Sequence, residues 1–365
     1  MPTLDQERLL WGHVGVRRFA YNKMKSLSEK YYKHFGKTLS VVNMGKMITR
    51  MKNRDKYKWL KEYNADVPKE AIRDFDKARQ KSFADFGNAY HTKFKSKYDL
   101  YQGFALDHRK CKVKKKTICI TKVGYVKTSR QLPRKRRLSN PRVVFDGLHW
   151  YISVGVETAE IEQMLSDDVI GVDVGIKDLC VASDGFVVTN INKTPKVKKL
   201  INEKKKYQQQ MSKRFVKGQE QSNNYNKAKQ KHLKVSRKLN NIRDNHIHQT
   251  TNTLVKAKPS KIVVEDLSVQ FMLKNKKLSK AVSYQKINFF FNCLAYKCKL
   301  NKIEYIKAPR FYASSKICNC CGYKYNSKDC CKQWGLHIRS WECVKCNVSH
   351  NRDMNAAINL SKLVV

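Results

Sequence analysis

Two Cys-x-x-Cys pairs near the end of the chain most strongly limit how this sequence can fold. Cys318 and Cys321 form the first pair, Cys343 and Cys346 form the second, and 21 residues separate the pairs. Two pairs at such a spacing are typical of a tetrahedral Zn²⁺ site of the zinc-ribbon type, in which the metal supplies much of the folding free energy. We therefore predict a zinc ribbon over residues 311–346, with structural Zn²⁺ as a cofactor.

The other cysteines do not indicate a disulfide framework. The chain has 12 cysteines, and seven of them lie between the first and last members of these two pairs. The first residues lack the basic and then apolar pattern of a secretory signal, so we expect a cytoplasmic protein of a prokaryotic or virus-infected cell, where disulfides are rare. No apolar run of about 18 residues predicts a membrane span. Cys320, Cys330 and Cys331 have no predicted role, although Cys330 or Cys331 could replace a ligand.

Three acidic residues occupy positions where a charge is costly to bury. Asp173 lies in the apolar segment VIGVDVGI, Glu265 ends the apolar segment KIVVE, and Asp353 begins the last predicted helix. Each acid alone could be a paired structural carboxylate. In this order, however, the three are typical of an RNase H-like nuclease fold, where they hold two Mg²⁺ ions for phosphodiester cleavage. We predict these three residues as catalytic Mg²⁺ ligands, with Asp266 as the rival of Glu265. His350 could bind metal with the cysteines, but we expect it beside the three acids.

A large excess of positive charge predicts a polyanionic partner. Lys and Arg number 76 against 30 Asp and Glu, a formal net charge of +46. Self-repulsion at this net charge opposes compaction, so folding does not explain it. Basic and aromatic residues are interleaved along the chain, which favours nucleic acid over a membrane as the partner. Residues 193–250 predict a basic helical hairpin, which is either a solvated arm or a nucleic-acid contact.

The patterns of apolar residues predict a multidomain α+β chain. Residues 1–97 have helical periodicity. Residues 98–160 contain short β-branched and aromatic segments separated by turns, which predict a small β-barrel. Residues 161–310 combine strands, including a hairpin through SDG, with helices, and a final helix lies within residues 347–365.

Four segments, taken in order, resemble the TnpB family, which comprises transposon-encoded OrfB-type proteins related to the type V CRISPR nucleases. The segments are GVDVGIKDLCVASDG, IVVEDLS, PRFYASSKICNCCG and WECVKCNVSHNRDMNAAINL. The segments RRFAYNKM and FKSKY in the N-terminal half resemble the family more weakly. Asn351 stands where the family usually has an acidic residue.

The resemblance implies an RNA-guided DNA endonuclease, often labelled a transposase, with a guide RNA from the transposon end and target DNA as partners. It implies a helical recognition region over 1–97, a wedge-like barrel with a truncated start over 98–160, and a RuvC-like nuclease domain over 161–310 and 347–365 into which the zinc ribbon is inserted. Arg310 and Arg352 are candidate nucleic-acid contacts, whereas Arg134, in a basic linker, is not assigned.

Two alternative functions stay open. A decayed or domesticated relative would bind RNA or DNA without efficient cleavage, although the three acids are all present. A strand-transfer transposase would use the same three acids, although a zinc ribbon just before the last acid favours the guided nuclease.

Overall fold

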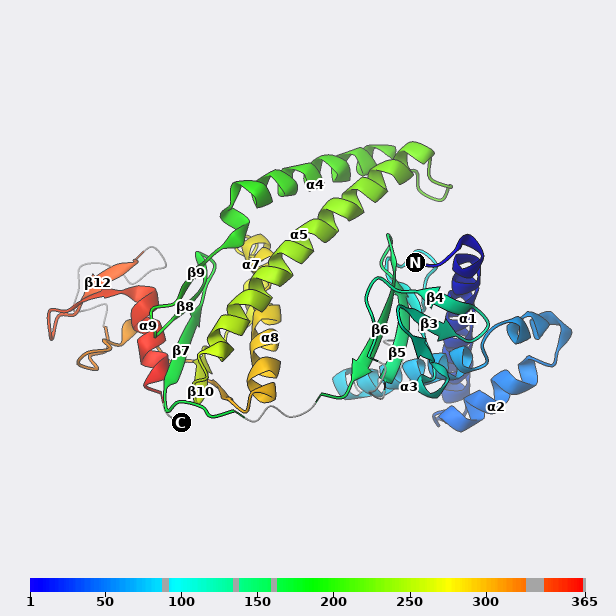
Figure 1. Cartoon of the computed structure of the whole chain (residues 1–365), viewed down its shortest axis with the longest axis horizontal. Coiled ribbons are helices and arrows are strands. Elements are labelled where there is room, and N and C mark those ends of the chain that lie inside the picture. Colours follow the sequence, from blue (N-terminus) through cyan, green and yellow to red (C-terminus); the bar gives the residue numbers. More distant parts are fainter. Residues whose placement is uncertain (87–91, 134–137, 159–162, 326–337, 364–365) are drawn as a thin grey trace. The chain divides into compact units, whose positions relative to one another are not determined.

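The chain forms two compact units, Met1–Thr158 and Ala159–Val365, in a computed structural model (Figure 1). The structure describes residues 1–86, 92–133, 138–158, 163–325 and 338–363. Arg134, Cys330 and Cys331 therefore lie outside the described residues. No helix within these ranges combines the length and apolar character that a membrane crossing requires.

The first unit begins with the helical region that the periodicity predicts. Its helices are α1 (Leu4–Phe35), α2 (Val41–Met51), the 3₁₀ helix η1 (Asp55–Glu62) and α3 (Asp66–Phe86). A capping box begins α1, because Thr3 accepts from the backbone of Gln6 and Gln6 accepts from the backbone of Thr3. Gly36 ends the helix in the left-handed conformation that glycine adopts without a steric penalty. Buried side chains such as Met24, Met44 and Phe75 join α1, α2 and α3 in one core.

The rest of the first unit is built from six strands in two sheets. The strands are β1 (Gln102–Ala105), β2 (Val113–Lys114), β3 (Thr117–Ile120), β4 (Gly124–Lys127), β5 (Leu138–Phe145) and β6 (Trp150–Val156). One sheet has the order β1-β5-β6 and the other has the order β2-β3-β4, and all the pairings are antiparallel. The expected strands are present, and no ladder of hydrogen bonds joins the two sheets in the described residues, so the wedge-like barrel stays a prediction.

The second unit contains a five-stranded mixed sheet. Its strands are β7 (Val169–Val174), β8 (Asp178–Ala182), β9 (Val187–Thr189), β10 (Lys261–Val264) and β11 (Glu304–Lys307), in the order β11-β10-β7-β8-β9. The strands β7, β8 and β9 form an antiparallel meander, and β10 lies parallel to both β7 and β11. The SDG turn joins β8 to β9, with Gly185 in the left-handed conformation and the Asp184 carboxylate accepting from Phe186 N.

Helices cover both faces of this sheet (Figure 1). The helices of this unit are α4 (Pro195–Arg214), α5 (Asn223–Lys256), α6 (Val269–Lys274), α7 (Ser279–Gln285), α8 (Ile287–Leu300) and α9 (Arg352–Ser361), of which α5 and α8 pack on one face of the sheet and α9 on the other. Val172 of β7 packs with Leu254 of α5 and Phe290 of α8 on one face. Val263 of β10 packs with Leu360 of α9 on the other face. The α5/α8 face holds the larger core, because the alternate residues 170, 172 and 174 of β7 all contribute to it.

The predicted basic hairpin is confirmed as α4 and α5. These helices pack against each other through Val197, Leu200, Val235 and Leu239. The loop between them begins at Phe215, whose side chain is exposed. The apolar seam uses only one stripe of each helix, so the many Lys side chains of this hairpin face solvent.

Candidate functional site

A close contact between α9 and β7 brings together sequence-distant parts of the second unit. Gly171 of β7 lies so close to α9 that a Cβ atom on it would stand 2.0 Å from the carbonyl oxygen of Ala357 and 2.4 Å from the backbone nitrogen of Ser361. Only glycine allows a helix this near to a strand. The small and apolar residues in NAAINL serve this contact, because Ala356, Ala357 and Leu360 are all buried.

This contact aligns two of the predicted acids. Asp173 lies two residues beyond Gly171 on the same face of β7, a step of about 7 Å along the strand. Asp353 lies one turn before Ala357, a step of about 6 Å along the helix. Together with the larger effect of burial, the negative charge of Asp353 raises the pKa of Asp173, so the two carboxylates lie near each other at the same end of the sheet.

The carboxylate of Glu265 completes the group. Val264 pairs with Val172 in the parallel register of β10 and β7. Glu265 follows Val264, and Asp173 follows Val172, so the two acids lie at the same level of the neighbouring strands. Burial, together with the negative charges of Glu265 and Asp353, raises the pKa of Asp173 to about 8. Burial also raises the pKa of Glu265.

Neither Asp173 nor Glu265 forms an ion pair or a hydrogen bond through its carboxylate among the described residues. Half-buried carboxylates that repel one another are stabilised by a bound cation, and oxygen donors suit Mg²⁺. The three acids are nevertheless less tightly gathered than the thiols described below. Of the described residues, those thiols alone form a set of at least three His, Cys, Asp or Glu ligand atoms within 4.8 Å of one another.

Two arginines place positive charge at the same end of the sheet. Arg352 and Arg339 both lower the pKa of Asp173, against the larger effect of burial. An Arg339 guanidinium nitrogen lies 3.6 Å from a carboxylate oxygen of Asp353. Arg352 donates to the carbonyl of Ile338 at 3.5 Å. Arg352 was anticipated from the sequence, whereas Arg339 was missed, because it stands 14 residues before Asp353 with no motif to mark it.

The rival acid, Asp266, has a different environment from Glu265. Its carboxylate accepts from Arg310 at 3.1 Å and lies 4.0 Å from Lys307. The charge of Asp266 is therefore balanced locally, while the charge of Glu265 acts on Asp173. The structure does not bring Arg310 into contact with the three predicted acids, and its predicted role in binding nucleic acid stays a prediction.

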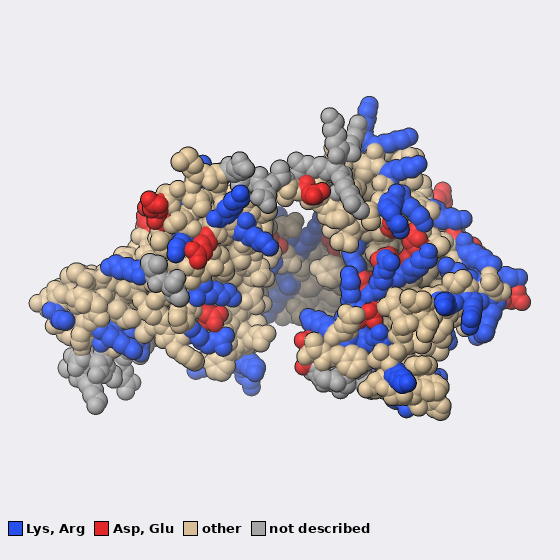
Figure 2. All heavy atoms as spheres, turned by 90° about the horizontal axis from the view of Figure 1, so that it is seen from below, with Lys and Arg blue, Asp and Glu red and all other residues tan. Residues whose placement is uncertain are grey.

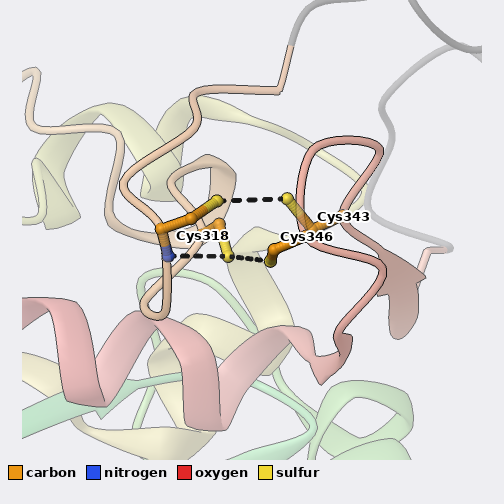
Figure 3. A group of neighbouring side chains, drawn as sticks. Cys318, Cys343 and Cys346 are labelled. Atoms are coloured by element: carbon orange, nitrogen blue, oxygen red, sulfur yellow. Dashed lines mark hydrogen bonds between the residues drawn. The ribbon is translucent and has the colours of Figure 1, made fainter.

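The four predicted cysteine ligands meet in one cluster (Figure 3). The Sγ atoms of Cys318 and Cys346 are 3.6 Å apart, and those of Cys321 and Cys343 are 3.5 Å apart. These distances exclude disulfides, whose sulfurs are about 2.0 Å apart. They are near the separation of about 3.8 Å that four thiolates at about 2.3 Å from a tetrahedral Zn²⁺ would have. The cluster therefore fits a structural zinc ion.

The local backbone favours a thiolate at Cys343, whereas at Cys346 a backbone hydrogen bond is outweighed by burial and the neighbouring thiols, which raise the pKa of Cys346 to about 12. Burial opposes ionisation of Cys343, but the backbone N–H groups of Cys346 and Lys345 outweigh it and lower the pKa of the Cys343 thiol to about 7. The strands β12 (Ser340–Glu342) and β13 (Ser349–Asn351) pair on either side of this loop. The short hairpin thus presents Cys343 and Cys346 to the first pair.

The expectation that His350 lies beside the acids is wrong. Its Nε2 lies 3.0 Å from the Sγ of Cys318, and its buried ring packs on Trp341, with the ring centroids 4.8 Å apart. Alternation along β13 accounts for this, because His350 faces its cross-strand partner Trp341 and the thiols. His350 is therefore part of the wall of the cysteine cluster.

Two buried asparagines of α9 fasten the cysteine cluster to the helix that carries Asp353. Asn359 donates to the carbonyls of Ser314 and Ile317 at 2.8 and 2.6 Å. Asn355 also donates to Ile317 at 2.7 Å and accepts from the backbone of Asn319 at 3.0 Å. These bonds hold the loop that leads into Cys318. Sequence reasoning missed both residues, although two Asn four positions apart in an apolar helix are a signal of a buried polar contact.

Asn351, the departure from the usual acid, caps α9. Its side chain accepts from the backbone of Asp353 and Met354, both at 3.1 Å. An asparagine at this position typically stabilises a helix by about 1 kcal/mol relative to alanine. The substitution therefore preserves the helix start on which Asp353 depends.

Basic side chains outweigh acidic ones on the surface that Figure 2 shows. On this face, Lys and Arg side chains are widely spread and cover more area than Asp and Glu side chains. The formal net charge of +46 makes such a surface attractive to a polyanion.

Three family models match separate parts of the chain. A model described as "Probable transposase" matches residues 151–276, and one described as "Cas12f1-like, TNB domain" matches residues 288–360. A model described as "Helix-turn-helix domain" matches residues 1–37. In the structure these last residues contain the single helix α1, so the description of that model carries no argument for DNA binding here.

The chain is similar along nearly its whole length to proteins with assigned names. It is 26% identical to the "Putative RNA-guided DNA endonuclease" of Streptomyces pristinaespiralis, over 98% of this chain and 86% of that protein. It is 24% identical to the "Putative RNA-guided DNA endonuclease InsQ" of Escherichia coli, over 98% of this chain and 89% of that protein. Its fold is similar to the protein in the cryo-EM structure of the Cas12f1-sgRNA-target DNA complex, with a TM-score of 0.53 at 16% identity, covering 98% of this chain and 81% of the other.

Proposed function

Because the chain belongs to the OrfB family of transposon-encoded proteins, which includes TnpB, we propose that it is an RNA-guided DNA endonuclease. The observation that carries this proposal is the group of three carboxylates, Asp173, Glu265 and Asp353, at one end of a mixed sheet. The names of the two full-length relatives support the same activity.

The strand order supports an RNase H-like, RuvC-type nuclease domain. An antiparallel meander, β7 to β9, is followed by the parallel strands β10 and β11 and by a final helix that carries an acid. We assign this domain to residues 161–310 and 347–365, with the zinc ribbon at 311–346. Residues 1–97 would form the recognition region and 98–160 the wedge region. The boundary between the two compact units, at Thr158, supports this division.

Two kinds of metal site follow from the donor sets. Asp173, Glu265 and Asp353 would hold two Mg²⁺ ions, and the four clustered thiolates would hold one structural Zn²⁺. Bound Mg²⁺ supplies Lewis-acid stabilisation of the negative charge that develops during phosphodiester hydrolysis.

The protein's own groups prepare this site. Asp173 must lose its proton to act as a ligand. Burial and the negative charges of Glu265 and Asp353 oppose this loss and raise the pKa of Asp173, and a bound cation would favour it. Arg339 and Arg352 lie where a phosphate group would approach the acids, and their charges would hold the DNA backbone there. The contact at Gly171 keeps Asp353 in register with Asp173.

The basic surface suits a guide RNA from the transposon end paired with target DNA. In such complexes the protein holds the heteroduplex by its backbone, and base pairing reads the sequence. The net charge of +46 would attract the phosphate groups of both strands, and the affinity for nucleic acid should fall steeply as salt is added. The cytoplasmic location stays a prediction.

The test is cleavage by the protein with the RNA that copurifies with it. In Mg²⁺ the complex should cut plasmid DNA that matches the guide segment, and in EDTA it should not. Asp173→Asn should abolish cutting. Asp184→Asn is a matched control on the same sheet, because asparagine can still accept from Phe186 N in the turn. Continued cutting by Asp173→Asn would refute the assignment of the site.

Other outcomes would favour the alternative functions. The looser grouping of the three carboxylates is the observation that favours a protein that binds nucleic acid without cutting it. Tight RNA binding with no cleavage in Mg²⁺ or Mn²⁺ would support that function. Joining of transposon ends by the protein alone would support a strand-transfer transposase.

A further inference from the structure

A groove on the first unit has the composition of a site for an unpaired nucleotide. It has a volume of about 660 Å³ and lies between α1 and η1. One stripe of α1 lines it, with Gly12, Gly15 and Phe19 at spacings of three and four residues. Trp59 within η1 and Tyr63 just after it form the opposite wall. Ligand sites in proteins commonly have volumes in this range.

The aromatic wall is held in a defined orientation. The Trp59 ring meets Phe19 edge to face at 5.4 Å between centroids and meets Tyr63 at 6.4 Å. Tyr63 lies directly on the bare backbone of α1, because a Cβ atom on Gly12 would stand 2.1 Å from its ring. The three rings are only partly buried, so they pack on the core and still border the groove.

A buried histidine ties the two walls together. The Nε2 of His13 on α1 accepts from the backbone of Asn64 at 3.1 Å, and its Nδ1 lies 2.7 Å from the carbonyl of Leu9, to which it donates. The ring of His13 also meets Tyr63 at 5.2 Å. Burial lowers the pKa of His13, which keeps the neutral form that these two bonds require. The groove is therefore preformed, with rigid sides.

The groove also carries positive charge and amide groups. Arg18 and Lys23 line it, and neither forms an ion pair with an acid in the described ranges of the chain. Asn22 and Ser26 add polar groups along the same helix. Rings that stack on bases, together with cations that bind phosphate, are the combination by which proteins hold single-stranded nucleic acid.

We propose that this groove binds one nucleotide of a single strand, with its base against Trp59 and its phosphate at Arg18 and Lys23. The inference rests on the proposed function only in taking nucleic acid as the partner. A protein segment is the other occupant that an aromatic groove could take. The free cations favour the nucleotide, because a phosphate group would neutralise them.

Gly15 allows a test that leaves the fold intact. A Cβ atom at Gly15 would meet nothing within 4 Å, so a leucine there extends into the groove instead of into the core. Replacing a helical glycine also favours the helix. Gly15→Leu should therefore fill the groove without unfolding the protein, and Gly15→Ala should leave it open.

The measurement is fluorescence anisotropy of labelled 12-nucleotide oligo(U) and oligo(dT) with the RNA-free full-length protein. Gly15→Leu and Trp59→Ala should each weaken binding roughly 5- to 150-fold, the range for one stacked base. Gly15→Ala should bind as the wild type does. Tyr98→Ala, which removes an aromatic side chain that is 82% exposed outside the groove, should do the same. A preference for oligo(U) would identify an RNA nucleotide, and a preference for oligo(dT) would identify a DNA nucleotide.

The proposal would be overturned if Gly15→Leu bound the oligonucleotides with the wild-type affinity. A protein ligand that binds the wild type and Gly15→Ala, but not Gly15→Leu, would assign the groove to protein docking. This inference and the nuclease assignment have separate readouts, which are oligonucleotide affinity and DNA cutting. A wild-type protein that cuts no DNA, but whose oligonucleotide binding is lost in Gly15→Leu, would refute the nuclease and retain the groove.

Discussion

Replacing Gly171 by alanine should separate the acids of the proposed site by a calculable amount. The new Cβ atom would stand 2.0 Å from the carbonyl oxygen of Ala357, and Cβ atoms essentially never come within 3.0 Å of another heavy atom. The obstacle is the backbone of α9, so no side-chain rotation relieves it. The helix must therefore move away from β7 by about 1 Å, and Asp353 must move with it away from Asp173.

Two effects follow from this displacement. Overpacking of this kind costs about 1–3 kcal/mol. For a unit of this size the loss corresponds to a decrease in Tm of about 2–12 °C. A misplacement of about 1 Å in a reacting geometry can reduce the rate about 100-fold. Gly171→Ala should therefore lose most cleavage activity at temperatures where it is still folded.

The assay compares cleavage by the guide-RNA complex at 25 °C with thermal unfolding followed by circular dichroism. Gly45→Ala is the matched control, because its Cβ atom would lie in open space within α2. The control should be slightly stabilised and fully active. Wild-type cleavage by Gly171→Ala would show that the position of α9 does not set the geometry of the site.

Four further predictions concern the two metal sites. Below pH 8, Mg²⁺ must displace a proton from Asp173, so the Mg²⁺ concentration needed for half-maximal cleavage should rise up to about tenfold for each pH unit below 8; an unchanged requirement between pH 6 and pH 8 would contradict the raised pKa. A carboxyl group whose folded pKa is raised destabilises the fold as pH rises from about 4 toward 8, so in EDTA Asp173→Asn should raise Tm at pH 8 and have less effect at pH 5. Cys343→Ser should abolish the zinc content measured by mass spectrometry, whereas Cys320→Ser, which changes an exposed thiol outside the cluster, should retain one zinc per chain. Asn359→Ala removes a donor from the carbonyls of Ser314 and Ile317 and should destabilise the second unit by about 1–3 kcal/mol in urea unfolding. The variant should also lose zinc to a chelator faster than the wild type. Unchanged stability and zinc retention would show that Asn359 does not hold the cysteine cluster on α9.

Local patterns predicted much of this structure. The spacing of Cys318, Cys321, Cys343 and Cys346 was sufficient to predict their cluster, because a tetrahedral thiolate site needs little beyond two short knuckles. The helical periodicity and basic composition of residues 193–250 predicted the hairpin of α4 and α5. The apolar segment VIGVDVGI was expected to form a strand that carries Asp173, and it forms β7.

Patterns in the sequence failed where the answer depends on which distant strands pair. A small barrel was expected over residues 98–160, and the described strands there form two three-stranded sheets that no ladder of hydrogen bonds joins. Strand propensity is local, whereas closure depends on hydrogen bonds between segments far apart in the chain. His350 was similarly expected beside the acids. The pairing of β12 with β13 turns it toward the thiols instead.

The sequence by itself determined the chemistry that this protein can carry: thiolates at ligand spacing, three acids at the ends of core segments, and an excess of positive charge. Only the tertiary structure decided which groups act on one another. The nearness of α9 to Gly171 aligns two acids from the ends of a segment of 181 residues, Asp173 to Asp353. Arg339, Asn355 and Asn359 gain their roles from the same packing. The reason is physical: residue type and spacing set the possible bonds, whereas distances between remote segments are set by how helices and strands pack.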